Sequence, residues 1–289
     1  MTSPHLFCFG LGYTALALGR RLSADGWTIS GTCRTEERAA ALREEGIAAY
    51  LFDRDHLLSR EVLNGVTHLL LSIPPDAAGD PVLATHRNDI AVMCGLSWAG
   101  YLSTTGVYGD RGGGWVDETS ALLPTGERGQ RRVAAERGWL DLWGSRSIPI
   151  HIFRLAGIYG PRRSAFEALR TGRAKRIDKP GQVFSRIHIE DLAEVLIASI
   201  RRPRPGAIYN VCDDDPSPPE AVVAHAAALL GMPAPPLVPL DAAGLSPMAR
   251  SFYADNKPVS NALIKTELGV TLRYPNFRAG LAAILADEA

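Results

Sequence analysis

Short apolar runs alternate with amphipathic stretches over the first half of the chain. Runs at residues 6–9, 27–33, 47–52, 68–73, 101–104 and 150–154 predict strands. Residues 14–24, 36–45 and 131–143 predict helices, because each has one apolar and one polar side at helical spacing. Strands that alternate with helices are typical of βαβ units, in which right-handed crossovers join parallel strands. We therefore expect an α/β fold with a doubly wound parallel sheet.

The pattern changes after residue 154. Residues 190–200, 221–230, 258–268 and 277–286 predict helices, and residues 208–211 predict a short strand. Residues 232–239 are rich in proline, which lacks a backbone N–H donor, so this run predicts an extended connector. We expect a larger domain over residues 1–154, to which 186–205 return, and a smaller α+β lobe over 155–185 and 206–289.

Composition narrows the classes of partner. The chain has 31 basic and 31 acidic residues and a formal net charge of zero, whereas binding to nucleic acid or a membrane surface usually needs a basic excess. Because no apolar stretch reaches ~18 residues and no positive region opens the chain, we expect neither a membrane span nor a secretory signal. The four cysteines are scattered without metal-ligand spacing, which favours reduced thiols in a cytoplasmic protein and no metal site.

A glycine turn directly follows the first predicted strand and opens the first predicted helix. It contains Gly10, Leu11, Gly12, Tyr13, Thr14 and Ala15. Gly10 permits the tight turn, Gly12 lets a pyrophosphate approach the backbone, and Ala15 allows the helix to pack closely on the sheet. The helix N-terminus offers N–H groups to the phosphates. This context predicts that the larger domain binds a dinucleotide through Gly10 and residues 12–15.

The end of the second strand indicates which dinucleotide is preferred. A site for NAD typically has an acid about 20 residues after the turn, where it binds the ribose 2′-hydroxyl. In this chain Cys33 or Arg34 fills that position. Arg34 could pair with a 2′-phosphate, and Thr35 could add a hydroxyl donor. The sequence therefore favours NADP over NAD, although a solvated Arg34 at a helix start is the alternative.

Two later segments could complete the cofactor site. Asp53, after the third strand, could face the adenine or could simply form the turn at residues 53–56. Ser72, Ile73 and Pro74 end the fourth strand. They are expected at the carboxyl edge of the sheet, where cofactors lie.

Four segments resemble those of one enzyme family. They are Leu102–Gly109 (LSTTGVYG), Phe153–Pro161 (FRLAGIYGP), Arg186–Ala193 (RIHIEDLA) and Tyr209–Val211 (YNV). With the glycine turn, they are similar in kind and order to segments of the extended short-chain dehydrogenase/reductases, which include nucleotide-sugar epimerases and dehydratases. The resemblance covers residues 5 to about 225. It implies a Rossmann-type fold, a nicotinamide cofactor contacted by Leu155, a nucleotide sugar or other anionic substrate, and a homodimer.

The resemblance breaks at the long helix. The family uses a Tyr-x-x-x-Lys pair, in which the tyrosine exchanges a proton with the substrate, and a Ser/Thr that orients the substrate oxygen. Thr104 matches that Ser/Thr. Counting back from Glu136, the pair's positions hold Arg128 and Arg132, and residues 125–132 contain no tyrosine. Arg132 can donate to ribose hydroxyls, but Arg128 stays protonated at neutral pH and cannot supply a proton.

The resemblance thus implies an atypical member with Thr104, Arg128 and Arg132 as candidate catalytic residues. One hypothesis is an NADP-dependent oxidoreductase, or an epimerase/dehydratase-like enzyme, with non-standard catalysis. The other is a non-catalytic dinucleotide-binding protein that reports redox state to a partner.

Several other residues keep two interpretations. His188 is expected to be a packed histidine rather than a base, and Asp191 supplies negative charge near a helix start. Residues 112–114, three glycines, predict either a mobile loop near the site or a plain surface loop. Five arginines could gather near a substrate anion or lie in solvent: Arg128, Arg131, Arg132, Arg162 and Arg163.

Overall fold

The structure, a computed structural model, describes residues 3–288, which divide into two compact units. The first unit comprises the chain up to Thr104 together with Gln130–Arg154 and Ala193–Tyr209. The second comprises Thr105–Gly129, Leu155–Leu192 and the chain from Asn210 onward. Residues 1, 2 and 289 lie outside the described part, and so does part of the N-terminal segment considered above as a signal.

A seven-stranded parallel sheet forms the centre of the first unit and confirms the predicted fold class. Its order is β10-β6-β5-β4-β1-β2-β3. The strands are β1 (His5–Phe9), β2 (Thr28–Cys33), β3 (Ala48–Leu51), β4 (His68–Leu71), β5 (Trp98–Thr104), β6 (Ile150–Leu155) and β10 (Ile208–Val211). From β1 the chain builds the sheet in one direction through β2 and β3, and in the other through β4. The carboxyl ends of β1 and β4 therefore lie at the switch point where such sheets bind ligands.

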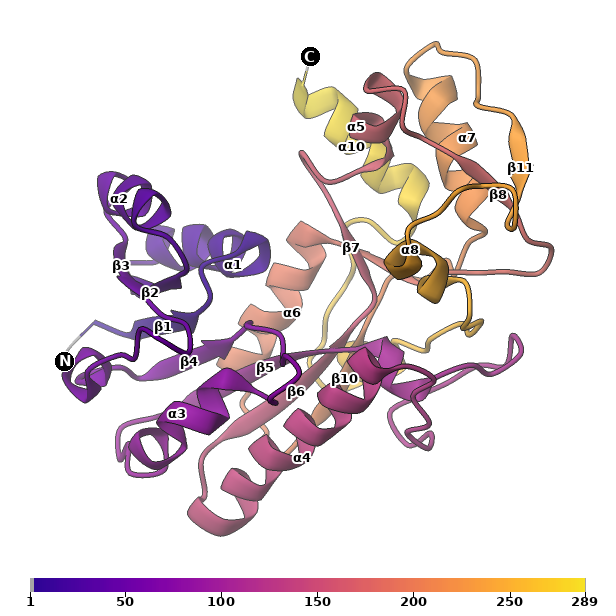
Figure 1. The fold of residues 1–289 in the computed structure, drawn as a ribbon. Helices are drawn as coiled ribbons and strands as arrows, with labels where there is room; N and C mark the ends of the chain where they lie inside the picture. The colour runs from indigo at the N-terminus through magenta and orange to yellow at the C-terminus, as the bar shows by residue number, and fades with distance from the viewer. Residues whose placement is uncertain (1–2, 289) are drawn as a thin grey trace. The chain divides into compact units, whose positions relative to one another are not determined.

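Helices cover this sheet on both faces (Figure 1). They are α1 (Tyr13–Ala24), α2 (Glu36–Glu44), α3 (Pro81–Ile90), most of α4 (Glu127–Arg146) and most of α6 (Ile189–Arg201), with a 3-10 turn η1 (Arg60–Leu63). Helices α3 and α4 share one apolar core with the sheet, in which Phe9, Tyr101 and Trp139 are buried. On α1, Gly19 allows close packing, because a Cβ there would lie 3.2 Å from Ile29.

The second unit is built from short strands and helices. Strand β7 (Gly157–Tyr159) pairs in parallel with β9 (Arg186–His188), and β8 (Arg176–Asp178) pairs with β11 (Leu237–Pro239). The remaining elements are η2 (Thr105–Tyr108), α5 (Ala165–Arg170), α7 (Pro219–Leu229), α8 (Pro247–Phe252), α9 (Ala262–Thr266) and α10 (Phe277–Glu288). Helices α5, α7 and α10 enclose a core that includes Phe166, Ala226 and Phe277.

The elements differ from the predicted ones in three places. The helix expected over 258–268 is only α9, because Val259 pairs with Val116 and the preceding chain is extended. The proline-rich run contains strand β11 as well as extended chain. Helix α3 was not predicted, although Asp80 caps it and Pro81 occupies its first turn, as is common at helix starts.

The division into units also differs from the predicted boundaries. Residues 105–129 belong to the second unit, and the returning segment is Ala193–Tyr209. The loop with three glycines accounts for part of this difference, because the N–H groups of Arg111 and Gly113 donate to the Asn256 carbonyl, and Val116 pairs with residues 258–260. Within residues 3–288, no helix is long and apolar enough to cross a membrane.

Candidate cofactor site

The glycine turn after β1 is held in place by its neighbours on β2 and β4. The Gly10 N–H donates to Thr32 Oγ1 (2.8 Å) and the Leu11 N–H to the Thr32 carbonyl (2.7 Å). The Ser72 hydroxyl donates to the Gly10 carbonyl (2.6 Å). Gly10 has φ +95°, and a Cβ there would lie 2.7 Å from Ser72 Oγ, so only glycine fits. The structure thus brings Ser72 and Ile73 beside the turn, as predicted from their place at the end of β4.

The start of α1 presents backbone groups rather than side chains. Gly12 is its N-cap and is exposed, with no side-chain cap and nothing within 4 Å of where a Cβ would stand. The first N–H groups of a helix have no partner inside the helix and carry partial positive charge. Thr14 and Ala15 are buried, which seats this turn of the helix on the sheet. Such an arrangement fits a pyrophosphate, which needs close backbone approach and N–H donors.

The end of β2 carries exposed basic residues. Arg34 is exposed, and Thr35 caps α2 because its side-chain oxygen accepts from the Arg38 N–H (3.3 Å). Cys33 is half-buried, and burial raises the pKa of its thiol. No carboxylate stands at residues 33–35, where a site for an unphosphorylated ribose would place one.

Asp53 forms a turn. Its Oδ1 accepts from the N–H groups of Asp55 and His56 (2.8 Å each) and lies 2.9 Å from the His56 ring nitrogen Nδ1. The His56 side chain is the main cause that lowers the pKa of this carboxyl, followed by the two N–H donors. The turn interpretation is thereby shown, whereas contact with adenine stays a prediction. Pro74 is exposed, and Leu155, at the end of β6, is buried and belongs to the second unit.

Two of the candidate catalytic residues, Thr104 and Arg132, lie where the end of β5 packs against α4. Thr104 is the last residue of the strand and is half-buried. On α4, Arg132 donates through Nη1 to the Leu102 carbonyl and to the Tyr101 hydroxyl (3.2 Å). Its guanidinium also lies 5.6 Å from the centre of the Tyr101 ring. Arg132 therefore ties α4 to β5. Helix α4 contains neither tyrosine nor lysine.

A buried polar cluster next to this junction was not predicted. Glu136 Oε2 accepts from Arg154 Nη2 (2.9 Å), and the Ser103 hydroxyl donates to Glu136 Oε1. All three side chains are almost fully buried. The only signal in the sequence is a carboxylate on the apolar side of a helix, because the partners are 33 and 18 residues away.

The other candidate residues lie in the second unit. The Arg128 guanidinium lies 5.4 Å from the Phe252 ring centre, and Arg162 occupies a turn with φ +61°. The His188 ring packs against Tyr159 and Tyr274, and burial lowers its pKa to about 4, so it is a packed neutral histidine. Asp191 does more than supply charge, because it accepts from the N–H groups of Arg273 and Tyr274. The five arginines are divided between the two units, Arg131 and Arg132 being in the first.

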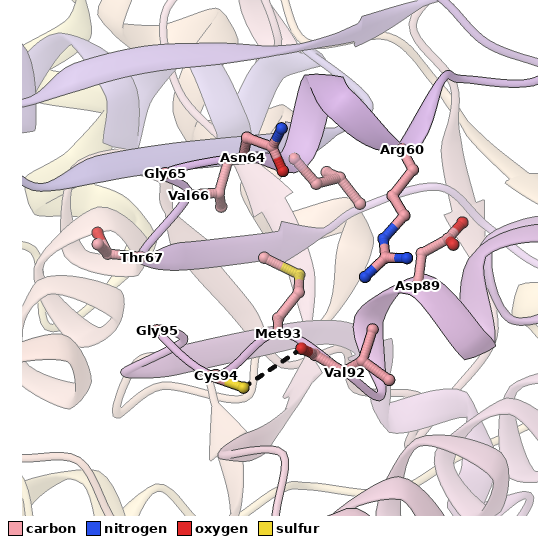
Figure 2. Close-up of a pocket in the computed structure, with 11 residues that line it drawn as sticks. Arg60, Asn64, Gly65, Val66, Thr67, Asp89, Val92, Met93, Cys94 and Gly95 are labelled. Carbon is pink, nitrogen blue, oxygen red and sulfur yellow. Dashed lines mark hydrogen bonds between the residues drawn. The ribbon is translucent and has the colours of Figure 1, made fainter.

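A separate pocket lies in the first unit, with a volume of about 340 Å³. It is lined by Arg60, residues 63–67, Asp89 and residues 92–95, which include Met93 (Figure 2). Because these residues precede β4 and β5, the pocket lies at the edge of the sheet opposite to the glycine turn. It is not part of the candidate cofactor site. Within residues 3–288, no group of three or more His, Cys, Asp or Glu side chains could hold a metal ion.

Comparison with known proteins identifies relatives over the whole length. A conserved protein of unknown function from Silicibacter pomeroyi DSS has a solved structure that is 53% identical, with a TM-score of 0.91 and 99% of each chain covered. This chain belongs to the same family. Protein YeeZ of Escherichia coli strain K12 is 27% identical over 282 residues, which are 92% of this chain and 95% of that protein. No family model matches the chain.

More distant solved structures share the fold. A UDP-glucuronic acid 4-epimerase from Bacillus cereus, in complex with UDP-glucuronic acid and NAD, is 14% identical with a TM-score of 0.77 over 99% of this chain and 100% of that one. A dTDP-glucose 4,6-dehydratase from Bacillus anthracis str. Ames, in complex with NAD, is 15% identical with a TM-score of 0.76 over 99% and 96%. The fold is therefore that of NAD-dependent nucleotide-sugar epimerases and dehydratases, as the sequence resemblance implied.

Proposed function

We propose that the first unit binds a nicotinamide dinucleotide and prefers NADP(H) to NAD(H). The observation that carries the proposal is the turn from Gly10 to Ala15, where the start of α1 has no side-chain cap and no atom lies within 4 Å of the position of a Cβ on Gly12. Exposed Arg34 and the absence of an acid at residues 33–35 favour a phosphorylated ribose. The NAD complexes of the epimerase and dehydratase support a nicotinamide cofactor in general.

Fluorescence titration with NADPH and NADH tests the preference. Wild type should bind NADPH at least tenfold more tightly, and Arg34→Ala should lower the affinity for NADPH while leaving that for NADH almost unchanged. Equal affinities of wild type for the two would refute the preference for NADP while leaving dinucleotide binding intact.

We further propose that the chain is an oxidoreductase or an epimerase/dehydratase-like enzyme, with its substrate bound by the second unit. When bound, the nicotinamide supplies or accepts hydride. In this proposal Thr104, the last residue of β5, orients a substrate oxygen, and Arg128 of the second unit binds an anionic group of the substrate. UDP-glucuronic acid is the first substrate to test, because the Bacillus cereus enzyme was solved with it.

Turnover can be followed by NADP reduction with a nucleotide sugar, by NADPH oxidation with a carbonyl compound, and by chromatography of the sugar, with Thr104→Ala as the matched variant. Turnover that disappears in Thr104→Ala supports the enzyme, and the absence of turnover across a panel of nucleotide sugars and simple carbonyl compounds opposes it.

A second function, a redox-dependent binding protein without catalysis, is favoured by the contacts of Arg132. This side chain is committed to the Leu102 carbonyl and the Tyr101 hydroxyl, and no tyrosine or lysine accompanies it on α4. Such a protein should bind NADP and NADPH but turn over no substrate. A partner captured differently in the presence of NADP and of NADPH would support this function.

A further inference from the structure

Helix α2 places a second arginine beside Arg34. Thr35 is the N-cap of this nine-residue helix, and Arg38 is the third residue of its first turn. Side chains in a helix lean toward its N-terminus, so that of Arg38 is directed back toward the end of β2. Both Arg34 and Arg38 are exposed, and within residues 3–288 neither guanidinium takes part in a hydrogen bond or ion pair. Two arginines are therefore available at one strand end.

The electrostatics of Cys33 agree with this placement. Burial raises the pKa of the Cys33 thiol, the hydrogen bond to Thr35 and the positive charges of Arg43 and Arg38 oppose that effect, and the negative charge of Glu36 adds to it. The Arg38 guanidinium thus acts on the last residue of β2, where the cofactor ribose is expected to lie.

Two acidic residues, Glu36 and Glu37, stand in the first turn of α2, and one of them is paired with an arginine. Glu36 Oε1 lies 2.5 Å from Arg43 Nη1, two helical turns further on. Arg43 is itself fixed, because its Nε and Nη2 donate to the Ala49 carbonyl at 3.1 and 2.8 Å. One of the two carboxylates that would repel a phosphate is therefore paired with a fixed positive charge, which reduces its repulsion.

We propose that Arg38 and Arg34 together bind the 2′-phosphate of the cofactor, and that Arg43 pairs with Glu36 and so reduces its repulsion of this phosphate. A phosphomonoester carries a charge near −2 at neutral pH, which two guanidinium groups balance and one does not. The N–H groups at the start of α2 add donors. The proposal rests on the proposed NADP preference and names the residues that create it.

Titration of four proteins with NADPH and NADH tests the role of Arg38. We expect Arg38→Ala to lose about tenfold or more in affinity for NADPH and less than about twofold for NADH. Arg38→Lys, which keeps the charge but not the bidentate geometry, should lie between wild type and Arg38→Ala. Arg60→Ala is the matched control, because its guanidinium lies at the opposite edge of the sheet (Figure 2). It removes the same charge from the same unit and should change neither affinity by more than about twofold.

A double-mutant cycle tests the role of Arg43. Arg43→Ala should release Glu36 and weaken NADPH binding several-fold, and the second change Glu36→Gln should restore it. In addition, 2′-AMP should compete with NADPH for wild type better than for Arg38→Ala. In contrast, 5′-AMP should compete equally well for the two proteins.

The outcomes separate this proposal from the one on which it rests. An NADPH preference that survives unchanged in Arg38→Ala overturns the assignment of Arg38 and leaves the cofactor preference standing. Equal binding of NADPH and NADH by wild type, or binding of neither, overturns the preference for NADP and this assignment with it. Thermal unfolding of each variant checks that the exposed substitutions leave the fold intact.

Discussion

The glycine turn and the junction of β5 with α4 use their polar groups in opposite ways. At the turn, the start of α1 has no side-chain cap, and no atom lies within 4 Å of where a Cβ on Gly12 would stand. At the junction, Glu136 binds Arg154 and Ser103, and Arg132 binds the Leu102 carbonyl. The helix start at the turn lacks a side-chain cap, whereas the junction satisfies its polar groups with one another.

This difference separates the capacity to bind from the capacity to catalyse. A helix start without a side-chain cap costs some stability unless a ligand supplies the acceptors. A buried ion pair, in contrast, mainly fixes the position of the elements that carry it. The turn is the site that we propose for a cofactor, and the junction holds the end of β5, where Thr104 stands, against α4. Whether Thr104 then acts on a substrate is the point on which the two proposed functions diverge.

Breaking the buried pair should have the largest effect on stability. Glu136→Gln keeps the shape of the side chain but leaves the charge of Arg154 buried without its carboxylate, which typically costs about 3–5 kcal/mol. Urea denaturation gives the free energy of unfolding, and Arg137→Ala, exposed on the same helix, should change it by less than about 0.5 kcal/mol. The folded fraction of Glu136→Gln should bind NADPH as wild type does. A variant of full stability that lost NADPH binding would remove the distinction between the two regions.

Lowering the pH should weaken the interior at the opposite ends of β5 and β6 in a defined window. His151 on β6 is fully buried, and its Nε2 accepts from the Arg204 N–H (2.9 Å), so the neutral ring is required. Burial lowers its pKa from 6.5 to about 4 in the folded protein. Its contribution is complete above pH 6.5 and is lost as the pH falls through 4, with a total on the order of 3 kcal/mol.

Urea denaturation of wild type and His151→Gln at pH 7, 5.5 and 4.5 measures this contribution. Glutamine keeps an acceptor but does not titrate. The unfolding free energy of wild type should therefore fall more steeply with decreasing pH than that of the variant. Parallel profiles would show that His151 does not titrate in this range.

The sequence pattern predicted the glycine turn better than the junction of β5 with α4. The turn could be predicted because its small residues, the preceding strand and the following helix are adjacent in the chain. The same locality let Arg34 and Thr35 be placed at the end of β2. Helix α3 was not predicted because Asp80 and Pro81, which stand at its start, are also typical of loops.

The buried cluster could not be predicted from local pattern. Ser103, Glu136 and Arg154 come from β5, α4 and β6, and only the parallel arrangement of those strands brings them together. Asp191 illustrates the same limit, because its partners at residues 273 and 274 are more than 80 residues away. Long-range pairing of polar groups depends on tertiary geometry that periodicity does not contain.

Adding a methyl group at each glycine of the turn should separate folding from binding. In Gly10→Ala the new Cβ would lie 2.7 Å from Ser72 Oγ, and residue 10 has φ +95°. The substitution should therefore cost at least about 1–2 kcal/mol of stability and also lower the affinity for both cofactors. In Gly12→Ala the Cβ meets nothing within 4 Å, so stability should change by no more than about 1 kcal/mol. Gly12→Ala should nevertheless lower the affinities for NADPH and NADH alike by about tenfold or more, because the methyl group would stand where we expect the pyrophosphate to approach. Normal affinity in Gly12→Ala would place the phosphates elsewhere.

The smallest expected effect belongs to the cap of α2. Thr35→Ala removes the oxygen that accepts from the Arg38 N–H, which should lower the free energy of unfolding by about 1 kcal/mol. Because this cap also fixes the start of the helix that carries Arg38, affinity for NADPH should fall more than affinity for NADH. Thr35→Ser keeps the capping oxygen and should restore both quantities. Suppose instead that Thr35→Ala lost stability but kept its full preference for NADPH. The cap at the end of β2 would then serve the fold alone, as the polar groups at the junction of β5 with α4 do. Only the glycine turn would still differ from that junction.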